Sequence, residues 1–265
     1  MKRRRVLAFL SGLLATLMLA IGVRFILPTP AKAQSVTLLI AAAASLQDAL
    51  EELDPMFERA NRDITINYNF AASGPLQQQI EQGAPVDLFI SAAARQMNTL
   101  QERNLIVSNT RRNLLTNNLV LVVPRNSTLQ LSGFRQLTNP RVRHISIGEP
   151  RSVPAGQYAE ELFTNLGILD QLQSKFVLGN SVRNVLASVE SGNADAGVVY
   201  TTDARIADQV QQVATAPSNL HSPIVYPMAV IATSRNQEAT RTYARFLSSS
   251  QAQAVFRRYG FGIAS

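Results

Sequence analysis

The fold is decided by VTLLIA at residues 36–41 and by the patterns that follow it. This nearly continuous apolar run is typical of a strand buried on both faces of a parallel sheet. Apolar residues then recur at helical spacing, at Leu46, Leu50, Leu53 and Phe57. Two more strand patterns follow, ITINYNF at 64–70 and VDLFIS at 86–91, separated by a Gly-Pro turn and a helical pattern. This βαβαβ order predicts a parallel, doubly wound sheet.

A second unit of the same kind begins with LVLVV at 119–123. Its further strands are predicted at 145–148, 176–178 and 196–200, and its helices at 155–166 and 182–191. A last strand at 225–232 precedes one or two amphipathic helices within 238–256. The sequence therefore predicts an α/β protein of two lobes with a ligand cleft between them, each lobe a doubly wound, mostly parallel sheet flanked by helices.

The lobe boundaries follow from where the two units meet. We expect residues 34–115 and 228–265 to form the first lobe and residues 116–227 the second, so that the chain crosses between lobes twice. The hinges should lie near Leu115 to Asn118 and near Ser222 to Pro227. A ligand that touches both lobes would favour a closed form.

Residues 1–33 have the order of a secretory signal peptide. A basic cluster from Lys2 to Arg5 precedes an apolar run from Val6 to Val23, and Ala31-Lys32-Ala33 fits an A-x-A cleavage site. We expect cleavage after Ala33 and export to the periplasm. The alternative is an uncleaved membrane anchor, because the apolar run is about as long as a bilayer-spanning helix. The chain has no cysteine, which excludes a lipoprotein anchor and disulfides.

The basic excess of the chain is concentrated in the same front segment. The whole sequence has 25 Lys and Arg against 18 Asp and Glu. Six of these basic residues and no acidic one lie within residues 1–33, which leaves 19 basic against 18 acidic residues. The mature body is therefore near neutral, and binding to nucleic acid or another polyanion loses its support.

Five short segments, uncharged except for Arg183, stand where a predicted strand or loop leads into a helix. Helix N-termini leave N–H groups unpaired and carry a partial positive charge, so several that converge attract an anion without a cationic side chain. The segments also offer hydroxyl groups and small residues that let a ligand approach the backbone. They lie at residues 41–46, 71–74, 153–156, 181–183 and 198–200. Together they predict a site for a small, fully ionised oxyanion.

Each candidate side chain also has a purely structural interpretation. Ser45 and Ser73 could be ordinary helix N-caps. Tyr200, which ends an apolar strand, could be a core tyrosine with a satisfied hydroxyl. Ala155 follows Pro154 at a helix start and offers a free N–H. Arg183, on a first helical turn, is more often solvated or ion-paired than a ligand of an anion.

Short motifs recur in a fixed order through the chain. They are A-A-A-S-L at 42–46, A-S-G at 72–74, G-A-P-V-D-L-F-I-S-A at 83–92, V-P-A-G-x-Y-A at 153–159, V-R at 182–183, G-V-V-Y-x-x-D-A at 197–204, Y-P at 226–227 and R-Y-G-F at 258–261. This ordered set resembles the periplasmic molybdate-binding proteins of ABC transporters over essentially the whole mature chain. One departure is Gly74-Pro75, which replaces a hydroxyl-rich stretch that some relatives carry.

The resemblance implies a type II periplasmic-binding-protein fold whose ligand is molybdate or tungstate. In that family two serines, backbone N–H groups at an Ala and a Val, and a tyrosine hydroxyl hold the oxyanion. Carried over by motif, these are Ser45, Ser73, Ala155, Val182 and Tyr200, of which Val182 comes from the resemblance alone. The metal would be held through its oxygens, with no direct metal ligand from the protein.

The resemblance also implies partners. The closed form would dock on a membrane permease driven by a cytoplasmic ATPase. We expect a monomer without a cofactor.

The proposed site segments contain no Asp or Glu, which bears on anion choice. Molybdate and sulfate are full dianions at neutral pH, whereas hydrogen phosphate carries a proton that needs an acceptor. A buried unsatisfied group costs about 1–3 kcal/mol, so phosphate should bind roughly ten- to a hundredfold more weakly. Sulfate or another tetrahedral oxyanion stays the alternative ligand, since molybdate differs from sulfate mainly in size.

An exported serine hydrolase is the alternative of another class. Only His144 and His221 could serve as its base, neither stands in a recognisable triad setting, and the chain has no G-x-S-x-G elbow. No His, Cys and carboxylate cluster has metal-ligand spacing. The ligand-sensing domain of a transcription regulator can share such a fold, but the chain has no DNA-binding segment. A binding protein rather than an enzyme is therefore expected.

Overall fold

The structure is a computed structural model that describes residues 35–264. These residues form two β-sheets. The predicted leader and its cleavage site lie outside the described residues. The strands of the first sheet are β1 (Val36–Ala43), β2 (Ile64–Ala71), β3 (Leu88–Ile90), β4 (Arg112–Thr116), β10 (Val225–Val230) and β11 (Gly262–Ile263). Those of the second sheet are β5 (Leu119–Pro124), β6 (Ile145–Gly148), β7 (Phe176–Gly179), β8 (Ala196–Tyr200) and β9 (Val210–Thr215).

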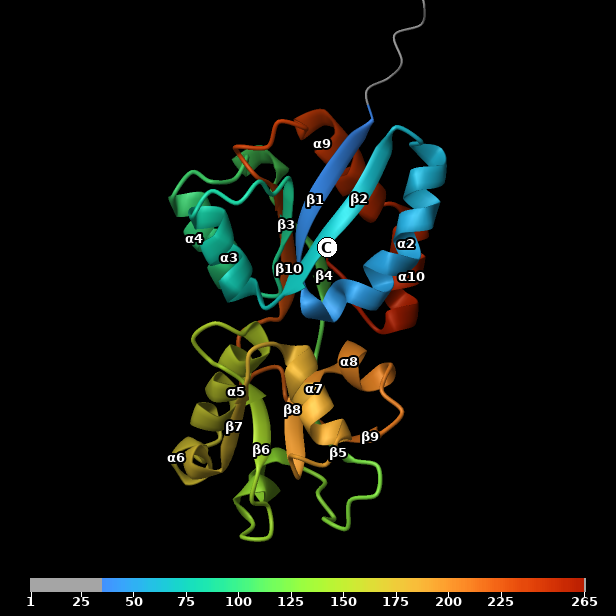
Figure 1. Cartoon of the computed structure of the whole chain (residues 1–265). Helices are drawn as coiled ribbons and strands as arrows, with labels where there is room; N and C mark the ends of the chain where they lie inside the picture. The colour runs from blue at the N-terminus through green and yellow to red at the C-terminus, as the bar shows by residue number, and fades with distance from the viewer. Residues whose placement is uncertain (1–34, 265) are drawn as a thin grey trace, which may run out of the picture. The chain divides into compact units, whose positions relative to one another are not determined.

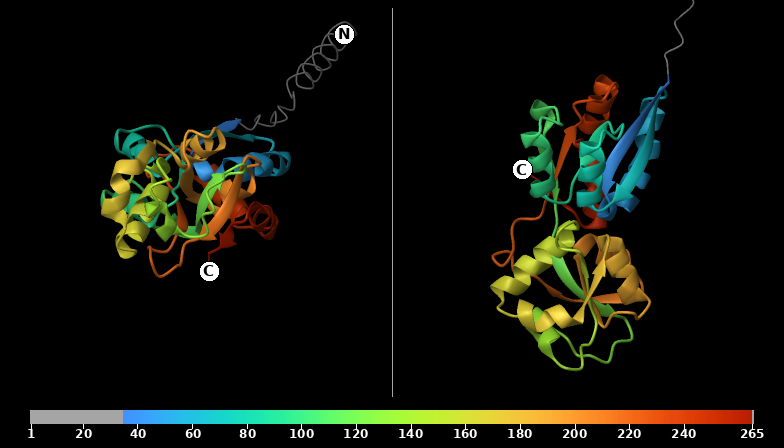
Figure 2. Two further views of the ribbon diagram at one scale, coloured as in Figure 1. Left: turned by 90° about the horizontal axis from the view of Figure 1, so that it is seen from below. Right: turned by 60° about the vertical axis from the view of Figure 1, so that its left-hand side comes forward.

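Helices flank both sheets (Figures 1 and 2). Around the first sheet they are η1 (Ala44–Leu46), α2 (Gln47–Ala60), α3 (Ser73–Glu81), α4 (Ala94–Glu102), η2 (Ser108–Thr110), α9 (Gln237–Leu247) and α10 (Ser250–Tyr259). Around the second sheet they are η3 (Phe134–Thr138), α5 (Pro154–Asn165), α6 (Leu169–Leu172), η4 (Gln173–Lys175), α7 (Val182–Glu190) and α8 (Thr201–Arg205). Every predicted strand is present with ends within two residues of the prediction, and the last predicted helical segment is two helices.

The two sheets contain some antiparallel strands, but most strands of each run in one direction, as predicted: β1, β2, β3 and β4 in the first sheet and β6, β7, β8 and β9 in the second. Their strand orders are β11-β4-β10-β3-β1-β2 and β7-β6-β8-β5-β9. Four strand pairs are parallel and five are antiparallel. Four of the antiparallel pairs involve β10 or β5, the two strands that receive the chain from the other sheet. They begin at the edge where their neighbours end, so they run antiparallel to them.

Three parallel strands of each sheet end at the edge that faces the other sheet. In the first sheet β1, β2 and β3 lead there into η1, α3 and α4. In the second sheet β6, β7 and β8 lead into α5, α7 and α8. Loops and helix starts at the carboxyl ends of parallel strands are where α/β sheets bind ligands. Here two such edges face each other (Figure 1).

The central strand β1 of the first sheet is covered on both faces. Leu38, Ile40 and Ala42 of β1 belong to one core, with Leu50 of α2, while Ala41 belongs to the core under α3 and α4. This alternation explains why VTLLIA reads as a continuous apolar run.

The chain passes between the sheets twice in the described range. Asn117 and Asn118 join β4 to β5, and residues 216–224 join β9 to β10. Strands β4 and β9 were not predicted, since their exposed residues interrupt the apolar pattern. None of the helices formed by residues 35–264 has the length and apolar character needed to cross a membrane.

Candidate functional site

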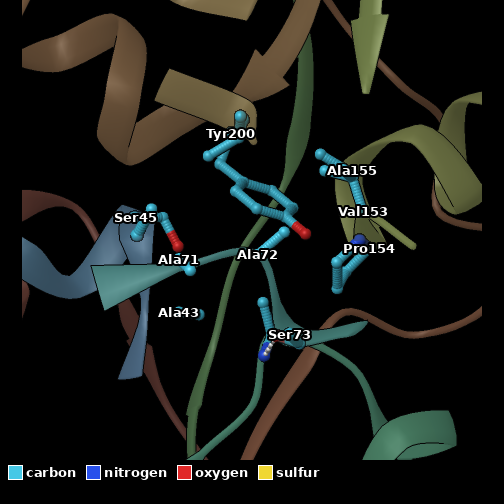
Figure 3. A pocket seen from close by; sticks show the side chains of 12 residues that line it. Ala43, Ser45, Ala71, Ala72, Ser73, Val153, Pro154, Ala155 and Tyr200 are labelled. Atoms are coloured by element: carbon cyan, nitrogen blue, oxygen red, sulfur yellow. Dashed lines mark hydrogen bonds between the residues drawn. The ribbon is translucent and has the colours of Figure 1, made fainter. Parts of the chain in front are cut away.

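All five predicted ligand residues line one pocket between the two sheets (Figure 3). Ser45 and Ser73 come from the first sheet's edge, and Ala155, Val182 and Tyr200 from the second's. The remaining lining residues are small or apolar: Ala43, Ala44, Ala71, Ala72, Ala92, Val153 and Pro154. No lining residue is charged. The free space between these residues is about 210 Å³ including its open side, which leaves room for a small ion but not for a large organic ligand.

Ser73 presents a hydroxyl whose oxygen already accepts one hydrogen bond. The side chain is fully buried, and its Oγ accepts a hydrogen bond of 2.9 Å from the backbone N–H of Ala92. The Ser73 proton is then left to donate into the pocket. Ser73 is the first residue of α3 and caps no backbone N–H, so the N-cap interpretation is wrong for it.

Ser45 is buried at the start of the first helical turn after β1, in η1. Its Oγ lies 2.9 Å from the hydroxyl of Tyr226 on β10. Tyr226 in turn accepts from Nδ2 of Asn117 at 3.2 Å. Like Ser73, Ser45 caps no N–H group of its helix. Both serines are therefore anchored by hydrogen bonds from elsewhere in the first sheet.

The second sheet contributes helix N-termini. Pro154 is the first residue of α5 and Ala155 the second, while Val182 is the first residue of α7. N–H groups in a first turn have no carbonyl partner within their helix and sit at its positive end. Neither α5 nor α3 has a side-chain cap, and in α7 Ser181 caps only the N–H of Asn184. Two N–H groups without a partner in their helices thus belong to the same pocket as the two serines.

Tyr200 closes the pocket with a hydroxyl that is buried and unpartnered. The residue is 1% exposed, and no hydrogen-bond partner among the described residues reaches its Oη. In Figure 3 the hydroxyl points into the space above Ala72 and beside Pro154. Burial, with Tyr226 nearby, raises the pKa of the Tyr200 hydroxyl well above 10, so it stays a protonated donor. The interpretation of Tyr200 as a core residue with a satisfied hydroxyl is therefore wrong.

Arg183 is held by carboxylates and does not line the pocket. Its guanidinium pairs with Asp48 of α2 at 2.5 Å and with Asp203 of α8 at 2.9 Å. Burial raises the pKa of the Asp203 carboxyl from 3.8 to about 6, while Arg183 and the backbone N–H of Tyr200 oppose the shift. The ion-paired interpretation of Arg183 is confirmed.

Beside the pocket, residues that flank the first sheet make direct hydrogen bonds to the loop between β6 and α5 of the second sheet. The N–H of Gly74 donates to the carbonyl of Ser152 at 3.0 Å, and Arg95 donates to the carbonyl of Arg151 at 2.9 Å. A Cβ at Gly74 would lie 2.4 Å from the oxygen of Ser152. Such a distance is far below van der Waals contact, so the absence of a side chain at residue 74 permits this approach.

Sequence reasoning did not identify the groups that support the serines. Asn117, Tyr226 and the N–H of Ala92 were not candidates, although Tyr226 and Ala92 lie within motifs that carry the family resemblance. No pattern links Ser45 to Tyr226, since 181 residues separate them in sequence.

The two histidines lie away from the pocket. His144 is exposed, and Nδ1 of half-buried His221 lies 2.8 Å from the carbonyl oxygen of Ser222. Residues 35–264 contain no cluster of three or more His, Cys, Asp or Glu that could hold a metal ion.

Comparisons with known proteins give the family. The family described as bacterial extracellular solute-binding protein matches residues 38–262. The molybdate-binding protein ModA of Haemophilus influenzae is 36% identical over 232 residues, which are 86% of this chain and 91% of that protein.

Two solved structures have the same fold. The substrate-binding domain of a provisionally assigned molybdenum ABC transporter from Clostridium difficile has a TM-score of 0.68 and 43% identity, covering 87% of this chain and all of that one. The sulfate-binding protein SubI of Mycobacterium tuberculosis has a TM-score of 0.76 at 17% identity, covering 85% of this chain and 86% of that one, which shows the fold alone. Because the family match spans most of the sequence, this chain belongs to the bacterial extracellular solute-binding proteins.

Proposed function

We propose that this protein captures molybdate, and tungstate in its place, outside the cytoplasm and delivers it to the permease of an ABC transporter. The observation that carries the proposal is the uncharged pocket that gathers three hydroxyls and two helix-terminal N–H groups. One of the hydroxyls, that of Tyr200, is buried without a partner. A buried unsatisfied hydroxyl costs about 1–3 kcal/mol, so a ligand oxygen that accepts from it is strongly favoured.

The ligand residues are Ser45, Ser73, Ala155, Val182 and Tyr200. Hydrogen bonds to a charged group stabilise by about 1.5–3 kcal/mol each, so five of them can offset the desolvation of a dianion. The pocket has no carboxylate to accept a proton from hydrogen phosphate. This chemistry selects a fully deprotonated oxyanion.

We propose molybdate rather than sulfate as the ligand because the more similar relatives are named for molybdate or molybdenum. The Haemophilus influenzae relative is named for molybdate and is 36% identical, whereas the sulfate-binding structure shares only 17% of its residues with this chain. The C. difficile structure, at 43% identity, belongs to a transporter assigned to molybdenum. Sulfate is the second candidate, since the same donors would also bind it.

We propose a binding protein without catalytic activity. In a serine hydrolase the nucleophile hydroxyl donates to a base, usually a histidine. Here the Ser45 and Ser73 hydroxyls contact Tyr226 and the Ala92 N–H instead. Neither histidine lines the pocket.

Delivery would depend on closure of two lobes, residues 34–115 with 228–265 and residues 116–227. The hinges would be the segments that cross between the sheets, near Leu115 to Asn118 and Ser222 to Pro227. The anion contacts residues of both lobes, so it stabilises the closed form that docks on the permease and its ATPase partner. The protein would act as a monomer in the periplasm after cleavage behind Ala33.

Isothermal titration of the purified protein, stripped of bound anion, tests this function. Molybdate and tungstate should bind tightly with a stoichiometry of one, micromolar or better, with sulfate and phosphate weak or silent. Tighter binding of sulfate than of molybdate would identify sulfate as the ligand. No detectable binding of any of the four anions would refute the proposal.

A further inference from the structure

Asn117, in the first crossing between the sheets, is fully surrounded by hydrogen-bond partners. It is 8% exposed, and its Oδ1 accepts from the backbone N–H of Asn118 at 2.9 Å. A backbone N–H can only donate, so this contact fixes which end of the amide is oxygen. The Nδ2 group must therefore point the other way, and it can only donate.

The Nδ2 group has two acceptors, one at each side of the pocket. One is Thr202 Oγ1 of α8 at 3.0 Å, and the other is the Tyr226 hydroxyl of β10 at 3.2 Å. Tyr226 is fully buried, and Asn117 Nδ2 and Ser45 Oγ are its hydroxyl's partners among the described residues. Nδ2 cannot accept, so the Tyr226 proton goes to Ser45 Oγ.

The Ser45 proton is then not donated to Tyr226 and is free to be donated to a ligand. Ser45 Oγ accepts from Tyr226, and the residue lines the pocket. We propose that Asn117 is a positioning residue that acts through Tyr226 to make Ser45 a donor toward the ligand, and thereby selects oxyanions without a proton. This inference rests on the proposed function, since it assigns the orientation of one hydroxyl at the same site.

The same principle operates at Ser73 by simpler means. There a backbone N–H, that of Ala92, supplies the fixed donor directly. At Ser45 the fixed donor is Asn117 Nδ2, which acts through the hydroxyl of Tyr226. Both of these groups belong to side chains, so substitution can change them. Asn117 is therefore a place where the polarity of the site can be reversed without touching a ligand residue.

Asn117→Asp is the variant that reverses the chain of hydrogen bonds with almost no change of shape. A carboxylate oxygen accepts the Tyr226 proton, Tyr226 then accepts from Ser45, and Ser45 presents a lone pair to the ligand. We expect molybdate affinity to fall at least tenfold by isothermal titration. We also expect the ratio of molybdate to hydrogen phosphate affinity to fall, because the Ser45 oxygen can now accept a proton.

The new charge by itself would also repel an anion, so two controls separate the effects. Asn184→Asp makes the same amide-to-acid change at an exposed residue in the first turn of α7, and should alter affinity less than threefold. In a Ser45→Ala background, Asn117→Asp should cost less than threefold, since no hydroxyl is left to reorient. Repulsion through space would persist unchanged in that background.

The outcomes are distinct. Wild-type affinity in Asn117→Asp, or equal losses with and without Ser45, overturns the inference while the function stands. A wild-type protein that binds no oxyanion overturns the function itself. Should Asn117→Asp fail to fold by circular dichroism, Tyr226→Phe replaces it: its loss of affinity must likewise vanish in the Ser45→Ala background, and an undiminished loss there overturns the inference.

Discussion

The two sides of the pocket supply donors of different kinds. On the first sheet's side, the Ser45 hydroxyl is hydrogen-bonded to the Tyr226 hydroxyl, and the Ser73 hydroxyl accepts from the Ala92 N–H. On the second sheet's side, Ala155 and Val182 offer helix-terminal N–H groups, and Tyr200 offers a hydroxyl without a partner. The hydroxyls of the first side are thus held in place before a ligand arrives. The second side has a hydroxyl without an acceptor, which a ligand oxygen can supply. The variants below separate these contributions.

Ser73→Asp should break the first side most severely. It places a carboxylate against a dianion in a buried site, so molybdate affinity should fall at least a hundredfold. Isothermal titration measures the loss, and circular dichroism checks that the fold is intact. Ser73→Ala is the matched control, which removes only one donor and should bind with intermediate affinity. Unchanged affinity in Ser73→Asp would remove Ser73 from the site.

Val182→Pro should remove one donor from the second side without disturbing α7. Proline is favoured at the first position of a helix, and the preceding Ser181 is extended, with φ −155° and ψ 164°, as a residue before proline prefers. Loss of one charge-assisted hydrogen bond should weaken molybdate binding about fiftyfold. Val182→Ala keeps the N–H and should bind within a few-fold of wild type. Equal affinities in the two variants would show that the N–H does not contact the anion.

Asp203 makes the stability of the second side depend on pH. Its pKa is raised from 3.8 to about 6, so between these values the folded protein holds a proton that the unfolded chain has lost. The free energy of unfolding that this group contributes is therefore present near pH 4 and is lost as pH rises through 6. From pH 4.5 to 7 the loss should be about 2 kcal/mol.

Urea unfolding of wild type and Asp203→Asn at the two pH values measures this loss. The difference between the two proteins should change by that amount, in favour of the variant at pH 7. A difference that is the same at both pH values would contradict the raised pKa.

Tyr200→Phe removes the unpaired hydroxyl of the second side, and two measurements should show the effect. Molybdate affinity should fall about tenfold, because one donor to the anion is lost. The thermal stability of the ligand-free protein should not fall, since the deleted hydroxyl has no partner to lose. Tyr226→Phe is the contrast, because its hydroxyl is partnered by Ser45 and Asn117 and its loss should destabilise the protein. A large loss of stability in Tyr200→Phe would indicate a satisfied core hydroxyl instead.

Gly74→Ala should have the smallest effect, because it acts on the approach of the two sides. The added Cβ would meet the Ser152 oxygen at 2.4 Å, and a small opening of the pocket can relieve the clash. Molybdate affinity should fall up to about tenfold, since the atoms that must move aside are backbone atoms of Ser152. Gly133→Ala is the control, since nothing lies within 4 Å of a Cβ there. Equal affinities would show that the contact tolerates a methyl group.

The sequence predicted the strands that carry the site more fully than the sheets that contain them. VTLLIA and VDLFIS are strongly apolar because β1 and β3 are central, and their ends place Ser45 and Ala92. Strands β4 and β9 have exposed positions and short apolar runs, so they gave no clear pattern. Which strands run antiparallel was not predicted, because the returns of the chain between the sheets are long-range features.

The site was predictable to the extent that residue type reveals the donor. Hydroxyls at Ser45, Ser73 and Tyr200 stand out, but a backbone N–H such as that of Val182 has no sequence signature and came from the family resemblance. Asn117 and Tyr226 escaped prediction because their role depends on a contact with Ser45 across most of the chain.

The most direct test of the account is a crystal structure of the molybdate complex, with the metal located by anomalous scattering. The account predicts one molybdenum position between the sheets, with its oxygens about 2.7–3.1 Å from Ser45 Oγ, Ser73 Oγ, Tyr200 Oη and the N–H nitrogens of Ala155 and Val182. A metal position elsewhere, or one contacted from a single side of the pocket, would contradict it.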